Sequence, residues 1–326
     1  MNSLLDPVVM FFLLGIAAGA LKSNLEIPQA ISRFLSLYLM MALGLKGGFA
    51  LAKSGLTPDI AISLACAFGL ALVVPLAAYA LLRRHLNGYD AAAVSATYGS
   101  VSAVTFITAA QYLDARSIDY GGHMAAAMAL MESPAIIAAI VLANLQRKRD
   151  AGSAAAQGLA PASGPSLWTV IKDSLTDGTP LLLLGAMLIG ISSGEAGQKA
   201  FEPFTADLFK GMLAFFLLDM GLLVSRNVGG LRGKSLFVPF YAVAGPVSHA
   251  GVALLLGWLT GMSQGNTILL MVLAGSASYI AVPAVVRHAI PEANPTLYFG
   301  MSLGITFPLN ILVGIPVYTR LVGALW

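Results

Sequence analysis

The sequence predicts an all-helical, polytopic membrane protein with about ten spans, arranged as two inverted repeats of five. The chain of 326 residues is 58% hydrophobic and only 10% charged, with a mean hydropathy of +0.82, which is too apolar for a soluble domain. Its apolar stretches reach the roughly 20 residues that cross a bilayer as helix. Two Gly-Ser-x-Ser segments also repeat inside such stretches, the second starting 176 residues after the first.

The apolar stretches place the spans in order along the chain. The sixth is the shortest, and the fourth and ninth contain the Gly-Ser-x-Ser segments. We expect spans near residues 4–21, 28–45, 58–82, 91–113, 121–145, 179–193, 203–225, 235–260, 265–288 and 295–324.

A polar tract divides the chain into two similar halves. Residues 146–177 begin with a run of charges and continue rich in Ala, Gly, Ser and Pro, a composition that cannot bury a core and predicts a flexible loop. Residues 1–145 and 178–326 then form five-helix repeats, and their prolines and Gly-Ser segments recur in the same order. Because five is odd, the repeats enter the membrane from opposite sides and predict a two-fold axis in its plane.

The lysines and arginines predict the orientation. With the N-terminus outside, twelve of the eighteen basic residues fall on the cytoplasmic side, together with the loop at 146–177. Positive charge is concentrated in cytoplasmic loops of membrane proteins. We therefore expect a multi-pass protein of the plasma membrane with both termini outside.

The two Gly-Ser-x-Ser segments predict broken helices that hold an anion. A break at membrane depth is tolerated where it is buried in protein or lines a polar cavity, and in transporters that cavity is usually the substrate site. Each half-helix that starts after a break directs amides and its positive dipole end inward. The alternative is that small residues only allow close helix packing. The candidate residues are Gly99, Ser100, Val101, Ser102, Ala103 and Thr105 in the first break and Gly275, Ser276, Ala277, Ser278 and Tyr279 in the second.

Oxygen-bearing residues near two prolines predict a cation site. Glu132 and Ser133 precede Pro134, which frees a backbone carbonyl, and these oxygens suit a hard cation such as Na⁺. Thr306 and Asn310 occupy the equivalent region of the second half. The alternative for Glu132 is a protonated carboxyl bonded to a neighbouring helix.

The other ionisable or reactive residues give weaker signals. Asp219 is interpreted as a helix partner, and His249 as a hydrogen-bonding group rather than a proton carrier. Cys66 lies in an apolar run and is interpreted as an inert buried thiol.

Several other functions do not fit the sequence. The basic residues lie in loops rather than along one face, which does not support nucleic-acid binding. The segment 229–235 resembles a phosphate loop, but the first glycine of that pattern is replaced by Val228, and no strand precedes it. Neither break supplies a His or Lys to activate a serine, so we expect no enzyme. A channel stays open as an alternative, because half-helices also line pores.

Four segments together resemble the sodium-dependent bicarbonate permease family. They are Ile27-Pro28-Gln29-Ala30-Ile31-Ser32, the first break at 99–102, Met131-Glu132-Ser133-Pro134-Ala135 with Ala143-Asn144, and Ile290-Pro291-Glu292-Ala293-Asn294-Pro295. The resemblance runs through both halves. It implies a bacterial homotrimer whose protomers each have a core bundle with the broken helices and a gate bundle. It also implies uptake of HCO₃⁻ with Na⁺ and, in some members, closure by a PII-like cytoplasmic protein.

The chain departs from this family at two positions. Tyr279 stands where cyanobacterial members have an aspartate after the serines of the second break, and Glu132 stands where the family has aspartate. The first change removes a negative group, and the second moves one outward by a methylene.

Taken together, the sequence predicts a secondary transporter for a small monoanion, bicarbonate first among them, with Na⁺ as the coupling ion and without a cofactor or transition metal. The alternative is an anion channel, or a carrier of another small anion such as a short carboxylate, without Na⁺ coupling.

Overall fold

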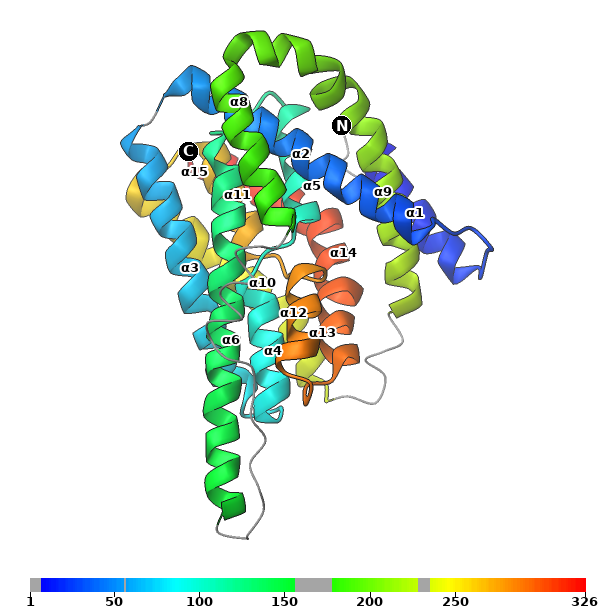
Figure 1. Cartoon of the computed structure of the whole chain (residues 1–326), viewed down its shortest axis with the longest axis vertical. Helices are drawn as coiled ribbons and strands as arrows, with labels where there is room; N and C mark the ends of the chain where they lie inside the picture. The colour runs from blue at the N-terminus through cyan, green and yellow to red at the C-terminus, as the bar shows by residue number, and fades with distance from the viewer. Residues whose placement is uncertain (1–6, 56, 156–177, 228–234) are drawn as a thin grey trace.

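A computed structural model describes residues 7–55, 57–155, 178–227 and 235–326, and within these ranges the chain is helical and contains no strand (Figure 1). The first half contributes four continuous helices and a broken pair, and the second half ends in a helix interrupted by π-helical turns. The elements are α1 (Pro7–Ala20), α2 (Gln29–Ser54), α3 (Pro58–Leu82), α4 (Gly88–Gly99), α5 (Ala103–Asp114), α6 (His123–Ala155), α8 (Gly178–Glu202), η2 (Pro203–Asp207), α9 (Leu208–Asn227), α10 (Phe237–Thr260), α11 (Gln264–Ala274), α12 (Ala281–Ala289), α13 (Pro295–Met301), η4 (Ser302–Thr306), α14 (Phe307–Leu309), η5 (Asn310–Gly314) and α15 (Ile315–Leu325).

Within the residues that the structure describes, seven helical segments are long and apolar enough to cross a membrane, and α1 and α11 are shorter apolar helices. One of the seven runs from Leu181 to Arg226 and contains both the predicted sixth and seventh spans. The prediction of an all-helical polytopic protein is therefore confirmed.

Two helices are longer than their predicted spans. Helix α2 continues to Ser54 and α6 to Ala155, where the sequence predicted ends at 45 and 145. Helix α8 is broken at Gly194, whose φ is +54°, directly after the predicted end of its span at 193. The extensions contain good helix formers such as Ala, Lys and Gln, which continue a helix after the apolar run has ended. The start of the predicted loop at 146 is thus helical, and residues 156–177 lie outside the described residues.

Four helices form a unit of their own, which we call the pair bundle. Helix α1 packs along α9 and α2 packs along α8, so each pair combines one helix from each half (Figure 1). Glycines allow the close approach, because a Cβ on Gly15 would lie 3.0 Å from the Cα of Gly221, and one on Gly190 would lie 3.0 Å from the Cα of Gly48. The remaining elements, α3–α6 and α10–α15, form what we call the core bundle.

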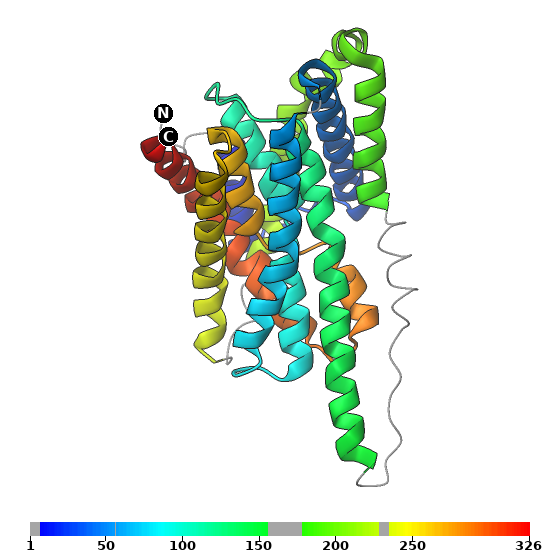
Figure 2. The same ribbon diagram turned by 90° about the vertical axis from the view of Figure 1, so that its left-hand side faces the viewer.

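The connections gather at two opposite ends of the molecule. The α3–α4 and α12–α13 turns and the far end of α6 lie at one end, and the α2–α3, α5–α6 and α10–α11 turns lie at the other with the end of α15 (Figure 2). These two sets are the ones that the basic residues predict to be cytoplasmic and external. We call them the inner end and the outer end.

Candidate functional site

The first break separates α4 from α5 at the middle of the core bundle. Gly99 is the last residue of α4, and Ser102 caps the new helix: its Oγ accepts from the backbone N–H of Thr105 at 3.2 Å and from the Thr105 hydroxyl at 2.8 Å. Serine is a preferred residue at this position because its oxygen satisfies an amide in the first turn. The cap therefore starts α5 at membrane depth.

The second break is longer and lies between α11 and α12. Helix α11 ends at Ala274, and α12 starts at Ala281. The Ser278 Oγ accepts from the backbone N–H of Val282 at 3.2 Å, so it satisfies a first-turn amide of α12. Both predicted broken helices are thus present as two helical segments each.

The two breaks are hydrogen-bonded directly to each other. The N–H of Ser102 donates to the Oγ of Ser276 at 2.9 Å, and the N–H of Ser278 donates to the carbonyl of Thr97 at 2.8 Å. The Ser276 hydroxyl in turn donates to the carbonyl of Leu273 at 2.9 Å. These two amides and the Ser276 hydroxyl are occupied by protein, so they hold the breaks together rather than face a ligand.

A proline in a neighbouring helix packs against the glycine of each break. A Cβ on Gly99 would lie 2.7 Å from ring atoms of Pro75 in α3, and a Cβ on Gly275 would lie 3.1 Å from the carbonyl oxygen of Pro246 in α10. Close packing therefore requires a glycine at 99 and leaves little room for a side chain at 275. The sequence analysis missed these prolines, although each interrupts an apolar span of its own repeat.

The first turns of α5 and α12 line a common cavity of about 120 Å³, between the core bundle and α2. It has room for a small polyatomic ion and a few waters, since a water occupies roughly 30 Å³ in the liquid. The N–H groups of Ala103 and Val104 have no acceptor among the described residues, as expected at a helix start. The lining residues are Ser36, Met40, Val101, Ser102, Ala103, Val104, Glu132, Ser278, Tyr279, Ile280 and Ala281.

The polar atoms of the cavity can serve both signs of charge. Ser102 and Ser278 accept amide hydrogen bonds, which leaves the proton of each hydroxyl to be donated. Two positive helix ends add to these donors. Glu132 of α6 is the only charged residue among the described lining residues. The arrangement can hold a small anion beside a cation.

The structure divides the predicted anion-binding residues into two groups. Val101, Ser102, Ala103, Ser278 and Tyr279 line the cavity. The other six lie behind it: Gly99, Ser100, Thr105, Gly275, Ser276 and Ala277. Sequence reasoning missed Ser36 and Met40, which are four residues apart on α2 and lie on the same face of that helix.

The predicted cation-site residues do not come together around Glu132. Thr306 is buried, donates to the carbonyl of Ala242 at 2.7 Å and lies 2.7 Å from the Tyr98 hydroxyl. Asn310 donates to the carbonyl of Gly275 at 2.7 Å, which caps the end of α11. Neither lines the cavity, and the side chain of Ser133 lies outside the described residues. Thr306 and Asn310 thus support the second break from behind.

The other ionisable residues also have defined places. Asp219 is buried in α9 and faces Ser32 of α2, which fits the interpretation as a helix partner. The ring of His249 lies 6.4 Å from that of Tyr241 in α10. Cys66 is a free thiol in α3 and is half-buried.

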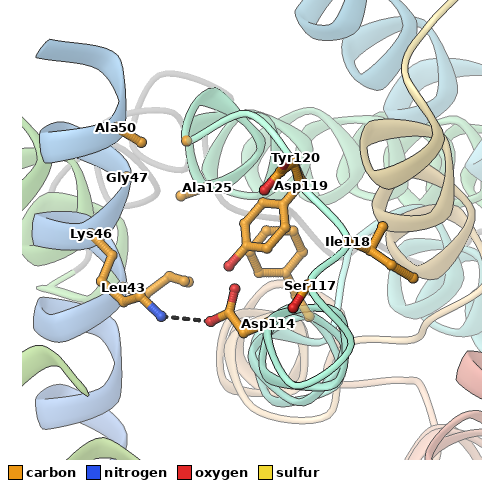
Figure 3. Close-up of a pocket in the computed structure, with 12 residues that line it drawn as sticks. Leu43, Lys46, Gly47, Ala50, Asp114, Ser117, Ile118, Asp119, Tyr120 and Ala125 are labelled. Atoms are coloured by element: carbon orange, nitrogen blue, oxygen red, sulfur yellow. Dashed lines mark hydrogen bonds and ion pairs between the residues drawn. The ribbon is translucent and has the colours of Figure 1, made fainter. Parts of the chain in front are cut away.

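An apolar layer separates the central cavity from a second cavity at the outer end. The outer cavity has a volume of about 410 Å³ and is lined by Leu43 of α2 and Phe106 of α5, among others (Figure 3). Met40, three residues before Leu43 in α2, and Val104, two residues before Phe106 in α5, line the central cavity. Met40, Leu43 and Phe106 are all buried and make up this apolar layer.

The chain matches a known protein family over most of its length. The model of the Na⁺-dependent bicarbonate transporter superfamily matches residues 7–323, nearly the whole chain. No curated protein matches the chain significantly.

Proposed function

The chain belongs to the Na⁺-dependent bicarbonate transporter superfamily, and from this membership we propose that it is a secondary active transporter that takes up a small monoanion, bicarbonate first, together with Na⁺. The observation that carries the proposal is the central cavity, where the first turns of two half-helices from different halves meet beside one carboxylate. This is how inverted-repeat transporters bind substrate and ion near the midplane.

The anion would bind between the starts of α5 and α12. The amides of Ala103 and Val104 and the hydroxyls of Ser102 and Ser278 are the donors that support this placement. No described lining residue is basic, so the helix ends and these donors supply all the attraction of the protein. A singly charged anion suits such a site better than a multiply charged one.

Glu132 supplies the physical basis for sodium coupling. A cation bound beside its carboxyl group would reduce the repulsion between that group and an anion in the same small cavity. Carboxylate and hydroxyl oxygens are ligands that Na⁺ accepts, as a hard cation. We propose that Na⁺ binds at Glu132 and thereby raises the affinity for the anion. Thr306 and Asn310 then act by holding the second break in place.

Movement of the two bundles against each other would carry the ions across. The helix pairs of the pair bundle, each drawn from both halves, and the two matched breaks support a five-plus-five inverted repeat with repeats at 1–145 and 178–326. The buried layer of Met40, Leu43 and Phe106 supports a carrier closed on its outer side rather than an open channel.

The location and assembly are part of the same proposal. We propose a bacterial plasma-membrane protein with both termini outside. The loops that carry most of the basic residues lie at the inner end and the other loops lie at the outer end, which supports this orientation. A homotrimer and a PII-like cytoplasmic partner rest on the family resemblance. Cross-linking in native membranes and pull-down with a purified PII-like protein test them.

The test is uptake of radiolabelled bicarbonate into proteoliposomes with and without an inward Na⁺ gradient. We expect uptake driven by the gradient, and loss of the Na⁺ dependence in Glu132→Gln, because the amide cannot neutralise a cation. Glu202→Gln is the matched control, since Glu202 is exposed at the end of α8. Uptake that is equal with and without the inward Na⁺ gradient would favour a carrier without Na⁺ coupling. Uptake that does not saturate would favour a channel.

A further inference from the structure

One ion pair joins the two bundles at the outer end. The Lys46 ammonium of α2, in the pair bundle, lies 2.7 Å from a carboxylate oxygen of Asp114, the last residue of α5 in the core bundle (Figure 3). The pair borders the outer cavity and also a second hollow of about 330 Å³, which Lys210 and Asp207 line on its other side. It therefore stands between the two bundles and borders both hollows at the outer end.

Each partner has a second contact within its own bundle. The Lys46 ammonium lies 5.4 Å from the ring centroid of Phe209 in α9, a cation–π contact inside the pair bundle. The phenol of Tyr120, in the core bundle, points toward the carboxylate of Asp114 (Figure 3). When the ion pair opens, both charged groups thus keep a partner and stay in place.

The pair is also accessible and weak. The side chains of Lys46 and Asp114 are 31% and 34% exposed, and a single contact joins them. Ion pairs of this kind contribute little net stability. An anion that reaches the outer cavity can therefore compete with the Asp114 carboxylate for the same ammonium.

We propose that Lys46 is the first anion-binding residue on the outer side, and that its pair with Asp114 is a latch that a small monoanion opens by replacing the carboxylate. The exchange keeps the charge around Lys46 constant, while it removes the bond that ties α2 to α5. The apolar layer of Met40, Leu43 and Phe106 next to the latch would then open. This inference rests on the proposed transport of a small anion.

Uptake kinetics test the two partners against each other. We expect Lys46→Gln to raise the KM for bicarbonate about tenfold, as for loss of one hydrogen bond to a charged group. Asp114→Asn should lower the KM, because Lys46 no longer has a competing carboxylate. Lys53→Gln removes a charge from the exposed end of the same helix and should leave KM unchanged. A rise of KM in both Lys46→Gln and Asp114→Asn would overturn the proposal, because the pair would then be only structural.

A second measurement does not require transport. Ser36→Cys in a Cys66→Ala background places a thiol in the central cavity and leaves the apolar layer unchanged. In right-side-out vesicles, Asp114→Asn should increase its labelling by an impermeant thiol reagent. Added bicarbonate should increase it in the otherwise unchanged protein but not with Lys46→Gln. An unchanged rate in Asp114→Asn would refute the latch, and absent uptake with latch-dependent labelling would refute only the proposed substrate.

Discussion

Two ion pairs lie at opposite ends of the molecule and differ in almost every physical respect. Lys46 and Asp114 connect the two bundles at the outer end by one contact between half-exposed side chains. Arg147 and Glu292 lie at the inner end within the core bundle, joined by two contacts of 2.8 and 2.7 Å. The Arg147 side chain is only 8% exposed. The outer pair is suited to open during transport, and the inner pair is suited to stay closed.

The surroundings of Arg147 explain what the inner pair holds. The guanidinium also donates to the Asn144 side chain at 2.8 Å and to the carbonyl of Ala289, the last residue of α12, at 2.9 Å. Helix α6, which carries Glu132, is thereby fixed to the half-helix that starts at the second break. Planar, bidentate recognition of a carboxylate is the contact for which arginine is suited and lysine is not. The inner pair thus fixes the position of α6 relative to α12, the two helices that line the central cavity on either side.

The largest effect should come from Glu292→Gln. This change leaves Arg147, whose side chain is 8% exposed, without its charge partner; the cost is below the roughly 3–5 kcal/mol of a fully buried pair, because the Glu292 side chain is 31% exposed. We expect the protein in detergent to unfold many degrees lower and its uptake to fall with it. Asp114→Asn should lower the unfolding temperature by no more than a few degrees, because an exposed pair contributes about 0–1 kcal/mol. Equal shifts in the two variants would remove the distinction between the pairs.

A smaller effect should appear at the breaks that the inner pair supports. Ser102→Ala and Ser278→Ala each remove a hydroxyl of the central cavity, so we expect the KM for the anion to rise about tenfold while membrane insertion continues. Ser276→Ala should instead lower the unfolding temperature, since its hydroxyl bonds only to protein. Ser192→Ala in α8 is the control, because that hydroxyl bonds only within its own helix.

If affinity stays unchanged in both Ser102→Ala and Ser278→Ala, the placement of the anion is wrong. If Ser276→Ala alone raises the KM, the division of the serines into cavity and supporting groups is wrong. Uptake at several anion concentrations, with protein amounts fixed by immunoblot, separates these outcomes from poor expression.

The sequence could locate the breaks but not divide their residues by role. Gly-Ser pairs within apolar runs are a local signal, and they mark both breaks correctly. The bond from Ser102 to Ser276 joins residues in opposite halves of the chain, so no local pattern reveals that Ser276 is occupied. Thr306 and Asn310 were predicted from their symmetric positions, yet they bond to Ala242 and Gly275 behind the cavity. The helix packing that decides this is absent from a linear pattern.

The ion pairs were also beyond sequence reasoning. Lys46 and Asp114 are 68 positions apart, and Arg147 and Glu292 are 145 apart. Each residue alone resembles an ordinary charge in a loop or at a helix end. Only the crossing of α2 over α5, and of α6 over the turn after α12, brings opposite charges together.

The smallest effect concerns pH at the inner pair. The Arg147 guanidinium, by hydrogen bonding, lowers the pKa of Glu292, which lies in the turn between α12 and α13. A carboxylate with a lowered pKa stabilises the folded state at all pH values above its ordinary pKa of about 4.3, and this contribution is lost as the pH falls through the lowered value. The difference in unfolding temperature between the unchanged protein and Glu292→Gln should therefore stay constant from pH 8 to 5. It should shrink only below about pH 4, where the glutamate itself becomes neutral. A difference that already disappears between pH 7 and 5 would mean that the inner pair opens in mild acid, and the contrast with the outer pair would no longer hold.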